Sequence, residues 1–100
     1  MIFGALEEKA WPAMLDCLAP LFPVRLYVAP PVHGTARPAA RPELLAARHP
    51  GTVCSSLDEA LAAAVAQAGE APILVTGSIF LIGEARATLL DLPRDPAIPL

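Results

Sequence analysis

The sequence predicts one α/β domain: a Rossmann-like, three-layer arrangement with a mainly parallel sheet of about four strands and helices on both faces. Strand-like and helix-like segments alternate along the chain, and this order is typical of parallel strands joined by right-handed crossovers. A length of 100 residues suits a single domain. Apolar residues make up 55% of the sequence but aromatic residues only 5%, so many small side chains are available for close packing of helix on sheet.

The first quarter of the chain predicts a strand and then a helix. Residues 1–3 read as a strand, and the helix begins at Trp11-Pro12, because proline in the first turn gives up no intrahelical hydrogen bond. Pro20 and Pro23 end it. Residues at the spacing of one helical face are expected to enter the core: Trp11, Met14, Leu15 and Leu18.

The second quarter predicts a strand at 24–29 and a long loop. Residues 30–42 contain four prolines, one glycine and three basic groups, a composition that favours an irregular connection. A short helix is predicted at 42–48 and a brief strand at 52–54.

The clearest helix follows Ser56. Ser56 and Glu59 form a capping box, in which the serine accepts from the Glu59 amide and the glutamate reaches back. Gly69 supplies a left-handed stop. The buried stripe is expected to be Leu57, Ala60, Leu61, Ala64, Val65 and Ala68.

The last quarter predicts a strand and a helix. The apolar run 73–76 is of the kind buried on both faces of a parallel sheet. A turn at Gly77-Ser78 leads into a helix over 80–90. We assign 1–91 to the domain and 92–100, with three prolines, to a C-terminal tail.

Composition disfavours several classes of protein. The net charge of −3 is spread over both signs without a basic stripe, which disfavours nucleic-acid binding. The apolar runs are far shorter than the ~20 residues of a membrane-spanning helix. No basic and apolar leader opens the sequence. Cys17 and Cys54 lie far apart and are expected to be reduced thiols in or near the core.

The remaining basic side chains give weak signals. His33 and His49 have no acid or cysteine at dyad or metal-ligand spacing, so both are expected on surface loops, and no metal site is predicted. Arg37 and Arg41 lie in the proline-rich loop. Either could reach a phosphate, but solvated loop charges are the favoured interpretation.

Two segments carry a resemblance to a known family. Residues 2–9, I-F-G-A-L-E-E-K, are similar to the V-F-G-A-L-x-D-K stretch of folylpolyglutamate synthases. Residues 73–86, I-L-V-T-G-S-I-F-L-I-G-E-A-R, resemble the family's V-L-V-T-G-S-L-Y-L-V-G-E-x-R. Residues 55–61 echo its S-x-x-E-A-L. The second acid of the family's D-K-D is replaced here by Ala10.

The resemblance implies the C-terminal domain of a folylpolyglutamate or dihydrofolate synthase of the Mur ligase superfamily. These enzymes use ATP and Mg²⁺ to join L-glutamate to a folate or dihydropteroate carboxylate in the cytoplasm. The sequence lacks the family's opening D-G-A-H-N-P strand and the helix after it, and it contains no P-loop motif. The implied partner is therefore the missing N-terminal P-loop ATPase domain, and no ligase activity or bound cofactor is expected of this chain alone.

The candidate binding site is Thr76, Gly77 and Ser78, where a strand meets a helix N-terminus. Ligands bind at the carboxyl ends of strands in such sheets, and helix amides favour anions. From the residues alone, Ser78 reads as a helix cap and Lys9 as a solvated charge. The resemblance makes Ser78 a ligand for the glutamate carboxylate, Lys9 a ligand for glutamate or phosphate, and Arg37 a possible third contact.

An alternative of another class is a free-standing flavodoxin-like module that binds a small anion or a protein. A complete module needs a self-sufficient sheet, whereas a fragment is expected to expose an apolar strand edge beside residues 1–4. A response-regulator receiver would need an acidic pair after the first strand, and residues 2–4 do not supply it.

Overall fold

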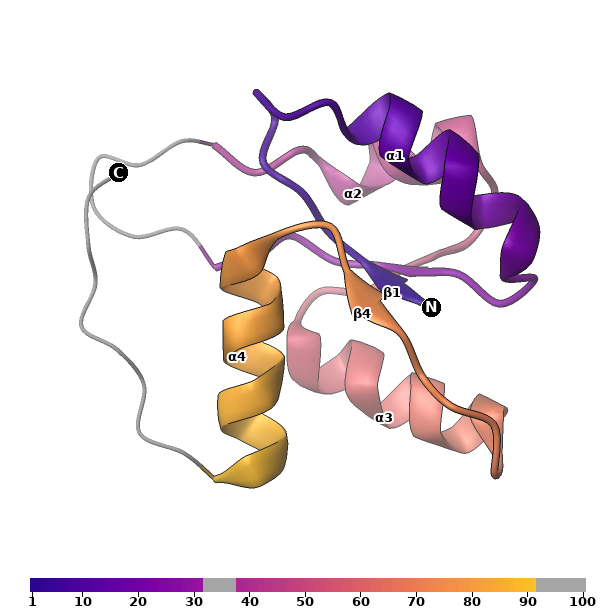
Figure 1. The fold of residues 1–100 in the computed structure, drawn as a ribbon, viewed down its shortest axis with the longest axis vertical. Helices are drawn as coiled ribbons and strands as arrows, with labels where there is room; N and C mark the ends of the chain where they lie inside the picture. Colours follow the sequence, from indigo (N-terminus) through magenta and orange to yellow (C-terminus); the bar gives the residue numbers. More distant parts are fainter. Residues whose placement is uncertain (32–37, 92–100) are drawn as a thin grey trace.

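A computed structural model shows a four-stranded, all-parallel sheet in the order β3-β2-β1-β4 (Figure 1). The structure describes residues 1–31 and 38–91. Each strand is two residues long: β1 at Ile2–Phe3, β2 at Leu26–Tyr27, β3 at Thr52–Val53 and β4 at Val75–Thr76. The predicted α/β class is confirmed. The predicted strands at 24–29 and 73–76 are longer than those observed.

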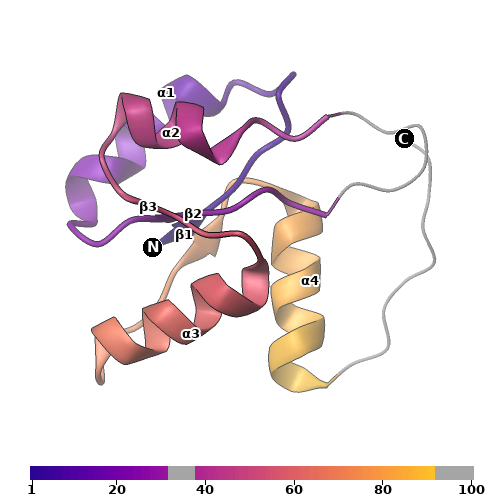
Figure 2. The ribbon, with the colours of Figure 1, turned by 180° about the vertical axis from the view of Figure 1, so that it is seen from behind.

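Helices cover both faces of the sheet. Helix α1 (Trp11–Leu18), its 3₁₀ extension η1 (Ala19–Leu21) and α2 (Pro42–Arg48) lie on one face. Helices α3 (Leu57–Ala68) and α4 (Ile79–Leu90) lie on the other (Figures 1 and 2). The predicted alternation of strands and helices is thus confirmed to within a residue or two at each helix end.

The core consists of two apolar clusters, one on each face of the sheet. The cluster under α1 and α2 contains Met1, Phe3, Ala5, Leu15, Ala19, Tyr27, Ala40 and Leu45. The cluster under α3 and α4 contains Ile2, Leu26, Val28, Cys54, Ala60, Leu61, Ala64 and Leu81. Ile2 and Phe3 alternate between the two faces, as neighbours in a strand must, and both are fully buried.

The ends of α3 form as the sequence predicts. The Ser56 hydroxyl accepts a hydrogen bond from the Glu59 amide at 3.1 Å. The Glu59 carboxylate reaches back one residue further than expected and accepts from the amide of Ser55 at 3.1 Å and from its hydroxyl. These bonds hold the pKa of Glu59 below its ordinary value. Gly69 ends the helix with φ of 59°.

Strand positions differ from the sequence prediction at the sheet edges. β4 is an edge strand, and its two residues are half-buried, so the expected burial on both faces is wrong. The exposed edge that the sequence predicts for a fragment beside residues 1–4 is not found in the described residues, because β1 pairs with β2 on one side and β4 on the other. The crossover from α3 returns the chain to the free side of β1 and covers it.

Two side chains predicted in the core lie outside it. Val65 of α3 is 61% exposed, because the helix buries a narrower stripe of Ala60, Leu61 and Ala64. Cys17 is exposed on α1, whereas Cys54 is buried as expected. Leu15 is the buried residue of α1, and its predicted companions are partly buried against the same cluster.

A charged cluster joins α1 to the end of α2. Arg48 donates two hydrogen bonds to Asp16, at 2.7 and 2.6 Å, and His49 Nε2 lies 2.7 Å from Asp16 Oδ1. The sequence has no acid at dyad or metal-ligand spacing from His49 and predicts this residue on a surface loop. The acidic partner, Asp16, is 33 residues away in the sequence, so the local sequence around His49 does not indicate the contact. The bonds from Arg48 and His49 hold the pKa of Asp16 well below its ordinary range.

This cluster predicts a pH-dependent effect of the substitution Asp16→Asn. A carboxyl whose pKa is lowered by folding stabilises the fold above its unfolded pKa and loses that contribution as the pH falls toward its folded pKa. We expect the wild type to unfold at a higher temperature than Asp16→Asn at pH 5, with the gap shrinking steadily below about pH 4. Thermal unfolding by circular dichroism checks this. Glu70→Gln, which removes an exposed charge outside the cluster, should show no such gap. A gap that persists undiminished at pH 2 would contradict the assignment.

Candidate functional site

The carboxyl ends of three strands meet closely at two glycines. A Cβ atom on Gly77 would lie 2.3 Å from the carbonyl oxygen of Gly4, and one on Gly4 would lie 2.2 Å from the carbonyl oxygen of Val28. Gly77 also has φ of 109°, a conformation that other residues rarely adopt. The amide of Gly4 donates a hydrogen bond to the carbonyl of Thr76 at 3.3 Å. Glycine is therefore required at both positions for β2, β1 and β4 to end side by side.

Ser78 follows this contact and begins α4. Its hydroxyl accepts a hydrogen bond from the Phe80 amide at 3.2 Å, and its carbonyl accepts from Ile82 at 3.0 Å. The residue is only 6% exposed, and it is the one polar residue in the buried core among those the structure describes. A hydroxyl in this position has donor capacity left, since its recorded bond uses it as an acceptor.

Each of the four strands is followed by a helix, and the two helices that begin with a capping serine, α3 and α4, differ in their charge environments. The first turn of α3 carries Asp58 and Glu59, which neutralise the positive end of the helix dipole. The first turn of α4 carries no acidic residue. The first amides of a helix have no intrahelical acceptor. An anion is therefore favoured at α4 and repelled at α3.

Lys9 lies beyond the same end of the sheet, on a separate loop. After β1 the chain runs past the sheet, and Leu6 forms an antiparallel bridge with Ala39. The amide of Lys9 then closes a turn on the Leu6 carbonyl at 3.1 Å. The side chain of Lys9 is exposed. Figure 1 shows this turn at the start of α1, on the side of the sheet that carries α1 and α2.

The structure thus brings Thr76, Gly77 and Ser78 into one turn and leaves Lys9 on the neighbouring loop. No hydrogen bond or ion pair joins Lys9 to that turn among the described residues. Arg37 and His33 lie outside the described residues, as does the tail 92–100.

The described residues do not fit a nucleotide–magnesium site. Among residues 1–31 and 38–91, no three His, Cys, Asp or Glu side chains lie close enough together to hold a metal ion. The sequence also lacks the P-loop that cradles phosphates. Within the same residues, none of the helices has the length and apolarity needed to cross a membrane.

Comparison with known proteins supports one relationship. The chain is 41% identical over 91 residues to a folylpolyglutamate synthase of Lacticaseibacillus casei. The chain is a homologue of part of that enzyme. The match covers 90% of this chain but only 20% of the synthase, so the chain spans about a fifth of its relative's length. The resemblance expected from the sequence is confirmed. No family model and no solved structure matches the chain.

The glycine contact in this synthase homologue predicts a strong effect of Gly77→Ala. The new methyl group would meet the Gly4 carbonyl and would also be forced to positive φ, so we expect a loss of about 1–3 kcal/mol in the free energy of unfolding. Urea unfolding measures this loss.

Gly83→Ala is the matched control. Gly83 lies within α4, and nothing lies within 4 Å of an added Cβ. Because alanine has the higher helix propensity, this variant should be more stable than the wild type by roughly 0.5–1 kcal/mol. Equal effects of the two substitutions would show that the contact at Gly77 is not tight.

Proposed function

We propose that the chain acts as the C-terminal domain of an ATP-dependent folylpolyglutamate or dihydrofolate synthase. The observation that carries the proposal is the buried Ser78 at the uncompensated N-terminus of α4, in a chain homologous to part of such a synthase. This domain would supply part of the L-glutamate site. It would work in the cytoplasm, where the folate substrates occur.

The chemistry of the α4 N-terminus suits a carboxylate. The first amides of α4 and the Ser78 hydroxyl can donate hydrogen bonds to an oxygen anion, while Gly77 leaves the approach free of a side chain. Lys9 would add a point charge from the neighbouring loop, for a second carboxylate of glutamate or for a phosphate. Arg37 is a further candidate for such a contact.

In the proposed reaction the substrate carboxylate attacks the γ-phosphorus of ATP and releases ADP, giving an acyl phosphate. The amine of L-glutamate then attacks the acyl carbon, and inorganic phosphate leaves as the amide forms. ATP and Mg²⁺ would be held by an N-terminal P-loop domain, because the residues described here do not fit them. Closure of the two domains would exclude water from the acyl phosphate. This chain alone should have negligible ligase activity.

A second candidate function is a free-standing module that binds a small anion without catalysis. Pairing of β1 on both sides favours it, since this strand has no open edge of its own. The α4 N-terminus would be the anion site in that case as well.

Ser78→Ala tests the site in both cases. We expect L-glutamate to shift the amide NMR signals of residues 77–80 of the wild-type chain. Loss of a hydrogen bond to a charged group should weaken this binding by about tenfold or more. Ser56→Ala, which removes the corresponding cap of α3, is the control: it should lower stability by ~1 kcal/mol and leave the glutamate-induced shifts unchanged. Shifts that centre on α3, or survive in Ser78→Ala, would contradict the site.

Lys9→Ala tests the ligase role itself. The segment of the L. casei enzyme that matches this chain would be replaced by residues 1–91, with the rest of that enzyme retained. An active chimera should lose ~10 to 100-fold in kcat/KM for L-glutamate on Lys9→Ala, because an ionic contact to the substrate is removed. Lys9→Arg should restore part of the activity. If the chimera is active and Lys9→Ala has no effect, Lys9 is a solvated charge; if glutamate binds but the chimera is inactive, the binding module is the better description.

A further inference from the structure

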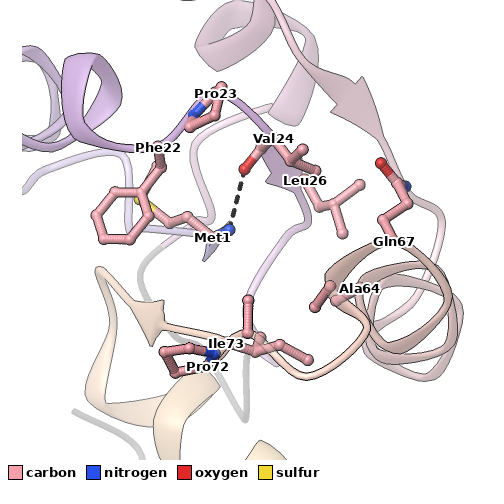
Figure 3. A pocket seen from close by; sticks show the side chains of 11 residues that line it. Met1, Phe22, Pro23, Val24, Leu26, Ala64, Gln67, Pro72 and Ile73 are labelled. Carbon is pink, nitrogen blue, oxygen red and sulfur yellow. Dashed lines mark hydrogen bonds between the residues drawn. The ribbon is translucent and has the colours of Figure 1, made fainter.

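Apart from scattered single side chains, apolar surface is open to solvent in two places. One is a groove of about 210 Å³ at the amino ends of the strands, lined mainly by α3 and by the segments before β2 and β4 (Figure 3). The other is α4, which stands at the margin of the molecule (Figures 1 and 2). This helix carries four of the ten large apolar side chains that are exposed among the described residues, and no other described element carries more than one. They are Ile79, Ile82, Leu89 and Leu90, with exposed fractions of 76%, 42%, 62% and 58%.

The exposed side chains form one stripe along α4, which we call the outer stripe. Its residues recur at intervals of three and four, the spacing of the a and d positions of a coiled-coil heptad. The three buried residues of the helix, Leu81, Ala85 and Ala87, lie off this stripe. A helix that is apolar all round is normally buried all round, so the outer stripe is expected to have a partner. The a and d positions are Ile79, Ile82, Arg86 and Leu89, with Gly83 and Leu90 beside them at e positions.

We propose that a second copy of this chain covers the outer stripe, with the two α4 helices antiparallel in a twofold-symmetric dimer. The intervals between the a and d positions are three, four and three residues, so the stripe reads the same in both directions and is complementary to itself. In the antiparallel pair Ile79 lies against Leu89 of the second copy. Ile82 lies against Arg86 of the second copy in the two inner layers. A parallel pair would place Arg86 against Arg86, and like charges opposed in an interface are costly. Charge therefore selects the antiparallel pair.

Gly83 gives the arginine room in this arrangement. Nothing lies within 4 Å of a Cβ added at Gly83, so the helix surface beside Ile82 is open. The methylene groups of Arg86 from the second copy can pack there while the guanidinium stays in water. Side chains on a helix point toward its N-terminus. Each arginine therefore points toward the C-terminal half of the other helix, whose dipole favours a cation.

The size of the outer stripe sets the strength of the contact. Its six residues in each copy are far fewer than the ~20–30 on each side of a standard stable interface. We therefore expect a weak dimer in equilibrium with the monomer. The inference goes beyond the proposed function and does not rest on it.

Sedimentation velocity at increasing protein concentration tests the dimer. We expect a monomer that converts to a dimer and to nothing larger, because a twofold contact closes on itself. Leu89→Lys places a charge in both outer layers and should weaken association by about 100-fold, since each of the two identical changes costs about tenfold. Lysine near the end of a helix is compatible with the dipole, so the monomer should keep its fold, as circular dichroism would verify.

Val65→Lys is the matched control. Val65 is 61% exposed on α3, against 62% for Leu89 on α4, and it lies outside the outer stripe. This variant should dimerise as the wild type does. If the wild type stays monomeric at every concentration, or if Val65→Lys weakens association as much as Leu89→Lys, something other than a second copy covers the stripe and the proposal is overturned.

Cysteine cross-linking tests the direction of the helices. The exposed Cys17 is first replaced by serine, and the Ile79→Cys and Leu89→Cys chains are then oxidised alone and as a mixture. The antiparallel pair predicts disulfide-linked dimers in the mixture and few in either chain alone. Equal cross-linking of Leu89→Cys alone would overturn the arrangement. The shifts that L-glutamate causes at residues 77–80 should persist in Leu89→Lys, so the dimer and the glutamate site fail separately.

Discussion

The arrangement of the molecule depends on the backbone pairing of β1. Only Ile2 and Phe3 form this strand, yet they sit between β2 and β4 and place one side chain in each apolar cluster. Backbone hydrogen bonds hold this strand on both sides. The amide of Ile2 donates to the carbonyl of Leu74 at 2.7 Å, and the amide of Leu26 donates to the carbonyl of Met1 at 2.9 Å. Because the strands are so short, few other contacts can fix the register of the sheet. The close approach of Gly4 to Gly77 and to Val28 fixes it at the carboxyl end.

This pairing gives the two ends of the sheet different chemistry. At the carboxyl end β1 and β4 stop at glycines, and the backbone after β4 turns directly into α4 with a buried serine at its start. At the amino end the strands are flanked by Phe22, Pro23 and Pro72, which leave an apolar groove. The buried serine and the first amides of α4 therefore lie at one end of the sheet and the apolar groove at the other. Such a division is what a parallel sheet produces, since all its carboxyl ends point the same way.

Much of the fold was predictable because its signals are local. The proline at the start of α1, the capping box of α3 and the glycine after it each act within one helical turn, and the structure has all three. Strand order was not predictable in the same way. The run at 73–76 is apolar enough for a central strand, but its place at the edge follows from the crossover that brings it beside β1. The prediction that Val65 is buried is wrong for a similar reason. Helix α3 packs on the sheet mainly through alanines and leaves the larger Val65 side chain exposed.

The site was predictable in part. The turn at residues 76–78 carries its own signals, a strand end, a glycine and a capping serine, and the structure joins them as expected. The pairing of Asp16 with Arg48 and His49 was not predictable, because it forms only when α1 and α2 pack together. The position of Lys9 relative to Ser78 depends on the bridge between Leu6 and Ala39, a long-range contact that the local sequence does not announce.

The contrast between α3 and α4 explains why, of the two serine-capped helix starts, the proposal assigns the anion to α4. Both helices begin with a serine whose hydroxyl accepts from an amide in the first turn. At α3 the acids Asp58 and Glu59 neutralise the helix end, and Glu59 also occupies the amide and hydroxyl of Ser55. At α4 the same turn holds Ile79, Phe80 and Leu81, which compete for no hydrogen bonds and add no negative charge. A helix end without such compensation keeps its attraction for an external anion, and burial of Ser78 beside it reduces the screening by water that would weaken that attraction.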